Sequence, residues 1–352
     1  MKKKYYLVVF GILLLTGCAE KQPPASLAEM LETGIEQEEA VGISALVYEN
    51  GTERYYGKGY ANSETLKAID GDTQFEIGSI TKSFISLLTM LAEEENLLSI
   101  DDPIGTVLPA HVNMPENMEQ EISIRNLLTH RSGLPFIPDN ISRGNQVEEF
   151  LNYTEQDLLE FLNHYELDSK PGENFAYSLV GYGLLGYILE GVYDSSLDEL
   201  IESKITRPLN MKRTSINFKE HPDDNYAVGY MKGEVTNWYR NKNCVLNGSG
   251  GIRSTANDLL IYMKAQAGII DTPLLECMKK TQEIQFEHED AMVCMGWLKN
   301  DDSMYHAGSS DGFFSFVTLN QTTDKILIVL ANRNNPDWIS AIAKYEMSFK
   351  RN

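Results

Sequence analysis

A nearly continuous apolar run over residues 85–92 predicts a helix buried at the middle of a domain, because a helix with so little polarity has no face to turn to water. Ser79 and Lys82 precede this run at a spacing of three residues, which places them on one helix face. Ser83 and Ser86 extend the same narrow polar strip. The pattern therefore puts a serine and a lysine at the start of an otherwise apolar helix.

The hydrophobic pattern elsewhere predicts strands near both ends of the chain and helices between them. Strands are expected at 41–48, 52–60, 292–298, 313–319 and 326–331. Helices are expected at 27–37, 122–133, 154–165, 178–192, 197–205, 254–267 and 338–349, and a flexible glycine loop at 247–251.

This order of elements predicts an α+β fold. Strands at the two ends most simply complete one antiparallel sheet, since short connections favour that pairing. We expect about five strands in this sheet, with the terminal helices covering its faces. The middle of the chain, about 97–245, is expected to form a mostly helical lobe. A ligand site is expected in the cleft between the sheet and this lobe.

The Ser79-x-x-Lys82 pair carries the first candidate chemistry. Lys82 falls in the first helical turn, where the helix dipole disfavours a cation, and burial disfavours the charged amine further. Both effects predict a lowered pKa for Lys82. A lysine of lowered pKa beside a hydroxyl can activate a serine without a histidine. The alternative is an N-cap serine beside a snorkelling lysine, and the short pattern alone does not decide between them.

Two other segments place polar groups beside predicted elements. Tyr177 stands at the N-terminus of the predicted helix 178–192, where the positive end of the dipole favours a phenolate; a packed tyrosine with a hydrogen-bonded hydroxyl is the alternative. His306 comes just before the predicted strand 313–319, in a stretch of small residues that would let a substrate lie against the sheet edge. Taken alone, His306 is more simply explained as a structural residue.

The composition limits the possible partners. The chain has 352 residues, with 30 Lys and Arg against 51 Asp and Glu, for a formal net charge of -21. Phosphate binding is driven by Lys and Arg, so this balance argues against a nucleic-acid partner. The sequence has no C-x-x-C and no H-E-x-x-H, and its six histidines are scattered. We therefore expect no metal and no cofactor. Three cysteines beyond residue 18 cannot all pair with one another: Cys244, Cys277 and Cys294.

The N-terminus predicts export. Three lysines at 2–4 precede an apolar run at 5–15, which is too short for a comfortable membrane span and is typical of a signal peptide. The run ends in Leu-Thr-Gly-Cys18, which resembles a bacterial lipobox and implies cleavage before Cys18 and lipidation of its thiol. An ordinary signal peptide with a chance cysteine is the alternative. The expected organisation is a signal peptide at 1–17, a lipidated tether at 18–27 and one domain at 28–350, held outside the cytoplasm on the bacterial cell membrane.

Five motifs occur in an order that resembles the serine beta-lactamase/penicillin-binding-protein superfamily, in its class C-like branch. They are Ser79-x-x-Lys82, L-L-T-H-x-S-G-L at 127–134, Pro171-Gly172 followed by Tyr177-Ser178, G-G-I-x-S-T-A-x-D-L at 250–259, and His306-Ala307-Gly308. This branch includes D-Ala-D-Ala carboxypeptidases, D-aminopeptidases and esterases. The resemblance extends over residues 28–345.

The resemblance implies roles for the site residues. Ser79 would be the acylated nucleophile, Lys82 would assist its deprotonation, and Tyr177 would serve as the shared general base and acid. His306 would occupy the place where many members carry a lysine or a histidine that faces the substrate. The backbone N–H groups of Ser79 and Ser309, next to Gly308, would form the oxyanion hole.

Two departures from the family pattern bear on the substrate. Many members have Tyr-x-Asn, whereas the third position here is Leu179, which puts efficient handling of peptides and beta-lactams in doubt. A second Tyr-x-Asn at 239–241 lacks the Pro-Gly entry and the apolar helix. His306 replaces the more common lysine. A neutral imidazole anchors a carboxylate weakly and favours esters or uncharged termini, although a protonated histidine still binds carboxylate.

These observations lead to one hypothesis and two alternatives. The hypothesis is a serine hydrolase that acts through a Ser79 acyl-enzyme on D-amino-acid peptides of cell-wall type or on small esters. A beta-lactamase is the first alternative. The second is a non-catalytic, membrane-tethered binding or sensor module with the same fold, which Leu179 favours. The G-x-S-x-G match at 308–312 belongs to α/β-hydrolases, which need a histidine after the serine, and none follows His306.

Overall fold

The structure is a computed structural model that describes residues 26–37, 40–108, 122–141, 152–216, 225–231, 233–236, 243–289 and 291–348. The predicted signal peptide, the predicted lipidation site at Cys18 and the second Tyr-x-Asn at 239–241 lie outside these residues. In the part of the chain that is described, no helix combines the length and the apolar character needed to span a bilayer.

An antiparallel sheet of nine strands, in the order β3-β2-β1-β13-β12-β11-β10-β9-β8, is the scaffold of the described chain. It joins the two ends of the sequence, since β1 pairs with β13 with Ile43 opposite Ala331. The long strands are β1 (Gly42–Glu49), β2 (Thr52–Asn62), β11 (Ser303–Ser310), β12 (Phe313–Asn320) and β13 (Lys325–Ala331). The short strands are β3 (Lys67–Ala68), β8 (Phe286–His288), β9 (Ala291–Val293) and β10 (Leu298–Lys299).

The predicted antiparallel α+β architecture is confirmed, but the sheet has nine strands where about five were expected. The predicted strand 292–298 is broken at Gly296, whose φ of +76° turns the chain between β9 and β10. The prediction missed β11, because its run of serine, alanine and glycine lacks the β-branched residues that mark a strand. His306 therefore lies inside a strand and not ahead of one.

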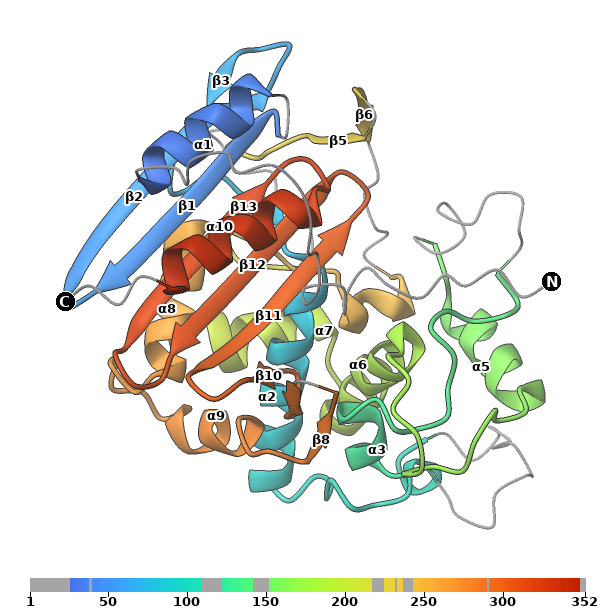
Figure 1. The fold of residues 1–352 in the computed structure, drawn as a ribbon. Coiled ribbons are helices and arrows are strands. Elements are labelled where there is room, and N and C mark those ends of the chain that lie inside the picture. Colours follow the sequence, from blue (N-terminus) through green and yellow to red (C-terminus); the bar gives the residue numbers. More distant parts are fainter. Residues whose placement is uncertain are drawn as a thin grey trace.

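Helices cover both faces of the sheet. On one face α1 (Leu27–Glu36) and α10 (Pro336–Ser348) lie side by side, and Leu31 and Ile339 join the apolar layer beneath them (Figure 1). On the other face lie α2 (Thr81–Glu94), α8 (Ala256–Gln266) and α9 (Leu275–Thr281). The pattern predicted all of these except α9, which is only seven residues long.

The remaining elements are short, apart from two helices of the predicted lobe. The helices are α3 (Ile124–Leu128), α5 (Glu155–His164), α6 (Leu179–Tyr193) and α7 (Leu197–Leu200), which continues as a π-helix, η3 (Ile201–Thr206). The 3₁₀ turns are η1 (Gly78–Ile80), η2 (Ile104–Thr106) and η4 (Val245–Ser249). Two small ribbons pair β4 (Phe75–Glu76) with β7 (Arg253–Ser254) and β5 (Gly229–Met231) with β6 (Glu234–Thr236).

Helix α2 is buried almost throughout, as its apolar sequence predicts. Its hydroxyl groups are tolerated there because each has a partner. Ser83 donates to the carbonyl oxygen of Ile80 at 2.8 Å, and Thr89 donates to that of Ile85 at 2.8 Å. Ser86 lies 3.1 Å from the hydroxyl of Tyr182 on α6. The central helix is thus fixed against the lobe as well as against the sheet.

Helix α6 packs backbone to backbone on η4. A Cβ added to Gly248 would come within 2.4 Å of the carbonyl oxygen of Tyr182, and one added to Gly183 would come within 2.6 Å of the Leu246 side chain. The expected flexible loop at 247–251 is therefore wrong in part, because its first half is a buried 3₁₀ turn held under α6. Only glycine allows this close approach.

We predict that Gly183→Ala lowers the free energy of unfolding by about 1–3 kcal/mol, because the added methyl group must push Leu246 and η4 away. Gly191→Ala on the same helix is the matched control: it meets no atom within 4 Å and should stabilise by about 1 kcal/mol through helix propensity. Urea unfolding of both variants tests this. Equal effects of the two substitutions would contradict the close α6–η4 contact.

Candidate active site

Ser79 lies in the 3₁₀ turn η1, directly ahead of α2, and is almost fully buried. Two glycines bring strand β11 against this turn. Gly78 has a φ of +49°, and a Cβ there would lie 2.7 Å from the backbone nitrogen of Ser309. A Cβ on Gly308 would lie 1.9 Å from the carbonyl oxygen of Ile77. The structure therefore brings together the predicted Ser79, Gly308 and Ser309.

Lys82 is fully buried and reaches back to the serine. Its Nζ donates to Ser79 Oγ at 3.1 Å and to the carbonyl oxygen of Ser249 at 2.6 Å. The first contact is the i, i+3 pair that the sequence predicts. The second comes from η4, to which the sequence assigned no role. Ser249 is thus a site residue that the prediction from the sequence missed, because it contributes only a backbone carbonyl.

Tyr177 stands beside this pair. The Lys82 Nζ lies 4.9 Å from the centroid of its ring. Its hydroxyl is buried and lies close to the hydroxyl of Ser79. Burial raises the pKa of Tyr177 well above its ordinary value, and the nearby Ser79 hydroxyl only partly opposes this rise. Desolvation therefore outweighs the helix dipole, which by itself favours the phenolate.

His130 holds the chain on both sides of Tyr177. Its carbonyl oxygen accepts from the N–H of Ala176 at 2.8 Å, and its Nδ1 accepts from the N–H of Ser178 at 3.1 Å. Its ring packs 4.2 Å from the Tyr177 ring, centroid to centroid. Burial, and then the positive charge of Lys82, lower the pKa of His130 well below its ordinary value, so that the ring is neutral and Nδ1 can accept. The sequence included His130 in a motif but gave it no role.

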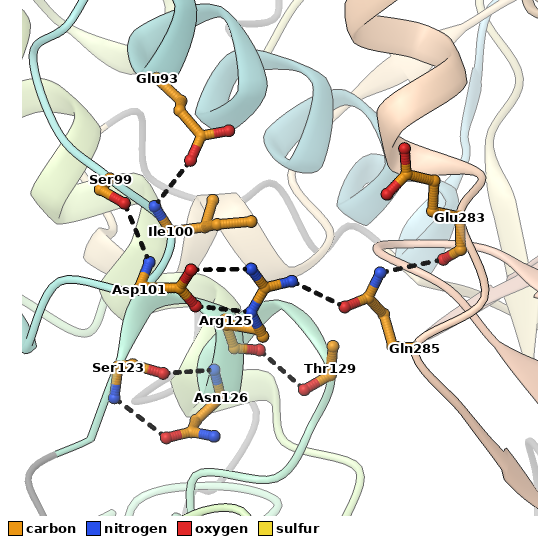
Figure 2. A network of polar contacts seen from close by, with 10 residues as sticks. All are labelled: Glu93, Ser99, Ile100, Asp101, Ser123, Arg125, Asn126, Thr129, Glu283 and Gln285. Atoms are coloured by element: carbon orange, nitrogen blue, oxygen red, sulfur yellow. Dashed lines mark hydrogen bonds and ion pairs between the residues drawn. The ribbon is translucent and has the colours of Figure 1, made fainter.

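The short helix α3, which leads into His130, is anchored by the polar network of Figure 2. Ser123 and Asn126 form a reciprocal capping box at its start. Arg125 binds both carboxylate oxygens of Asp101, at 2.7 and 3.0 Å. It also donates to Gln285 Oε1 at 2.9 Å, just ahead of β8. This network ties the segment before His130 to the edge of the sheet.

His306 lies in β11 and is also buried. Its Nδ1 lies 2.7 Å from the carbonyl oxygen of Ala307, which can only accept, so that Nδ1 carries the proton. Burial and the charge of Lys82 lower the pKa of His306 to about 4. The imidazole is therefore neutral at physiological pH.

Leu179 is the first residue of α6, and its backbone N–H donates to the carbonyl oxygen of Phe136 at 2.9 Å. Its side chain is half-buried and offers a ligand no amide.

A cavity of about 20 Å³ opens beside Tyr177 and His306. It is lined by imidazole, aromatic and apolar groups, among them His130, Phe175, Trp297, Leu298 and Tyr305. A larger hollow of about 580 Å³ on α5 shares no residue with this site.

The described residues include no group of three His, Cys, Asp or Glu side chains placed to hold a metal. All three cysteines beyond residue 18 are buried. The thiol of Cys277 donates to Glu94 at 2.6 Å, and that of Cys294 donates to the carbonyl oxygen of Gln282 at 3.3 Å. Cys294 also lines the cavity beside Tyr177 and His306.

The lowered pKa of His306 predicts a loss of stability in acid. In the unfolded chain His306 takes up a proton below about pH 6.5, whereas in the folded chain it takes up this proton only near pH 4. The free energy of unfolding should therefore fall over this interval, by about 3 kcal/mol for His306 alone. His306→Asn should make this decrease in the free energy of unfolding smaller, whereas His164→Asn on α5 should leave the decrease unchanged. Urea unfolding from pH 7 to pH 4 measures this; identical slopes in both variants would contradict the burial of a neutral His306.

Comparison with known proteins places the chain among serine hydrolases of one family. A family model described as Beta-lactamase matches residues 27–348. Protein flp of Staphylococcus aureus is 28% identical over 323 residues, which are 87% of this chain and 62% of that protein. The chain thus spans less than two thirds of that relative.

Two solved structures share the fold over most of the chain. The class C beta lactamase from Rhodobacter sphaeroides is 25% identical, with a TM-score of 0.79, and the match covers 91% of this chain and 97% of that one. The octameric penicillin-binding protein homologue from Pyrococcus abyssi is 26% identical, with a TM-score of 0.79, over 91% of this chain and 76% of that one. Since the family model matches the chain from α1 to α10, the chain belongs to the Beta-lactamase family of serine hydrolases, with a class C-like fold.

Proposed function

We propose that this chain is a lipid-anchored serine hydrolase of the bacterial cell surface, acting through a Ser79 acyl-enzyme on D-amino-acid peptides of cell-wall type or on small esters. The observation that carries the proposal is the 3.1 Å hydrogen bond between the buried Lys82 Nζ and Ser79 Oγ. A buried amine touching a serine hydroxyl is the arrangement that activates a serine without a histidine. The anchor rests on the predicted signal peptide and Cys18.

In the proposed acylation, Ser79 Oγ attacks the substrate carbonyl carbon and gives its proton to Lys82 in its neutral amine form. Tyr177 donates its phenolic proton to the leaving group as the bond to the carbonyl carbon breaks. The proton on Lys82 then restores the Tyr177 phenol. The backbone N–H groups of Ser79 and Ser309 bind the oxygen on which negative charge develops. The close approach at Gly78 and Gly308 supports that pairing.

In the proposed deacylation, water attacks the acyl carbon, and the same groups transfer protons in the opposite direction. A proton from water passes to the Lys82–Tyr177 pair, and Ser79 leaves as the free hydroxyl. His306 faces the substrate as a neutral imidazole, because its pKa is lowered by burial. A neutral group in that position supports esters and uncharged termini over a free carboxylate.

We predict that intact-protein mass shows one fluorophosphonate adduct on the wild-type protein and none on Ser79→Ala, because Ser79 is the serine held against Lys82. Ser83→Ala, in the first turn of α2, is the matched control and should still be labelled. Lys82→Ala should acylate roughly 10²–10⁴-fold more slowly, the usual contribution of a positioned base.

Penicillin and a p-nitrophenyl ester, tested on the same proteins, separate the candidate activities. A stable penicillin adduct lost in Ser79→Ala would indicate a penicillin-binding protein, and penicillin turnover would indicate a beta-lactamase. Ester turnover without reaction with penicillin would indicate an esterase. If Ser79 is not labelled and nothing is turned over, the proposal fails and the binding or sensor module takes its place.

We predict that His130→Ala lowers kcat for the p-nitrophenyl ester by about 10–10²-fold with little change in KM, because misplacing Tyr177 by a fraction of an ångström costs rate and not binding. His130→Asn should stay within a few-fold of the wild type. Its side-chain oxygen can accept from Ser178, and asparagine tolerates the φ of +58° at this position. Urea unfolding of both variants gives the folded fraction. Equal losses of kcat in the two variants would show that His130 does not position Tyr177.

A further inference from the structure

We propose that Asn334, which follows β13, is a positioning residue for the oxyanion hole: it fixes the end of β11 that carries the backbone N–H of Ser309. The inference rests on the proposed function, which assigns that N–H to the developing oxyanion. It adds a residue to which no sequence motif gave a role. The Asn334 Nδ2 donates to Ser309 Oγ at 2.7 Å and to the carbonyl oxygen of Ser310 at 3.2 Å. One side-chain amide therefore holds two consecutive residues of the strand.

The end of β11 needs such a support because it is paired with a strand on one side only. On that side β12 pairs with β11 as far as Ser310, which lies opposite Phe313. On the other side the pairs with β10 stop at Tyr305, and the turn η1 that carries Ser79 lies against β11 instead. A ladder therefore does not fix the Ser309 N–H from the side that faces the nucleophile.

The position of this N–H allows little error. A Cβ added to Gly78 would lie 2.7 Å from the backbone nitrogen of Ser309 and 2.8 Å from its carbonyl oxygen, so the strand already touches the turn. A shift of the strand away from the turn would lengthen the hydrogen bond from Ser309 to an oxyanion. Oxyanion-hole donors act at about 2.7–3.1 Å, so even a small shift costs rate.

Asn334 can hold the strand because its neighbours are themselves anchored. Asn332 is fully buried, and its Oδ1 accepts from the N–H of Gly42 at 2.6 Å. The side chain of Asn335 accepts from the N–H of Trp338, in the first turn of α10, at 3.2 Å. The segment that presents Asn334 is thus tied to the sheet on one side and to a helix on the other.

The first test measures kcat/KM for p-nitrophenyl acetate in Asn334→Ala, per active site counted by fluorophosphonate labelling. This ratio reports the steps up to acylation. Loss of an oxyanion donor costs about 10²–10³-fold, so we expect about 10-fold for a donor that is present but loosely held. Asn334 is exposed, and its removal leaves no cavity in the core.

Asn320→Ala is the matched control. Its side-chain oxygen accepts from Thr322 at 3.0 Å and from Thr323 at 2.9 Å in the turn after β12, opposite the other end of β11. This variant loses as many hydrogen bonds from the same sheet, and its kcat/KM should equal that of the wild type.

Phenylboronic acid separates positioning from a merely structural role. Ser79 Oγ bonds to its boron, the serine proton passes to Lys82 and no group leaves, so the adduct is a tetrahedral anion that resembles the intermediate. The Kd for phenylboronic acid should rise in Asn334→Ala by the factor by which kcat/KM falls. A variant that was only less folded would have fewer active sites but an unchanged Kd at each.

A double-mutant cycle tests whether Asn334 acts through Ser309. Ser309→Ala removes the hydroxyl that Asn334 holds but keeps the backbone N–H. Asn334→Ala should therefore cost about 10-fold in the wild type and no more than about 3-fold in the Ser309→Ala protein, where only the bond to Ser310 is left to lose. Asn334→Asp serves where the alanine variant does not fold. It cannot donate to the Ser310 carbonyl, and its kcat/KM should fall at least as far.

Unchanged kcat/KM and Kd in Asn334→Ala would overturn the inference while the Ser79 hydrolase stands. The strand end would then be fixed by Thr236, which donates to the carbonyl oxygen of Asp311 at 2.7 Å. Equal losses with and without the Ser309 hydroxyl would overturn it too, as would ester hydrolysis by a wild type that does not bind the boronate. If the wild type hydrolyses no ester and takes no fluorophosphonate, the proposed function fails and the inference fails with it.

Discussion

The burial of one amine governs the rest of this structure. Lys82 lies in the core with no exposed surface, and its Nζ is held by the hydroxyl of Ser79 and the carbonyl oxygen of Ser249. A buried amine is costly unless its hydrogen bonds are met, so both partners must stay in place. One partner comes from the turn that begins α2 and the other from η4. The lysine therefore couples the central helix to the lobe.

Glycines make these placements possible. Gly78 and Gly308 allow β11 to run against the serine turn, and Gly183 and Gly248 allow η4 to pack under α6. At each of these positions a side chain would meet backbone or buried atoms. The site is thus assembled by close approach of backbone segments far apart in the chain, and not by one local motif.

Burial then determines which of the site residues carry a charge. Tyr177, His130 and His306 surround the amine, and burial disfavours the charged form of all three. The result is a phenol and two neutral imidazoles around a single amine. These groups supply the proton donors and acceptors that the proposed acyl transfer uses.

The sequence by itself determined what depends on local spacing and periodicity. The i, i+3 relation of Ser79 to Lys82, the apolar helix α2, the first hairpin and the last two strands all follow from patterns within one segment. So does the antiparallel α+β architecture, since strands at both ends of the chain have few other ways to pair.

Only the tertiary structure decided the rest, for physical reasons that a pattern does not contain. Strand β11 forms because β12 offers it a complete ladder, although its own residues have little preference for a strand. The bond from His130 to Ser178 and the carbonyl of Ser249 that holds Lys82 join segments 48 and 167 residues apart. The pKa of Tyr177 is raised and not lowered because the burial of its hydroxyl, which depends on the packed fold, outweighs the local helix dipole.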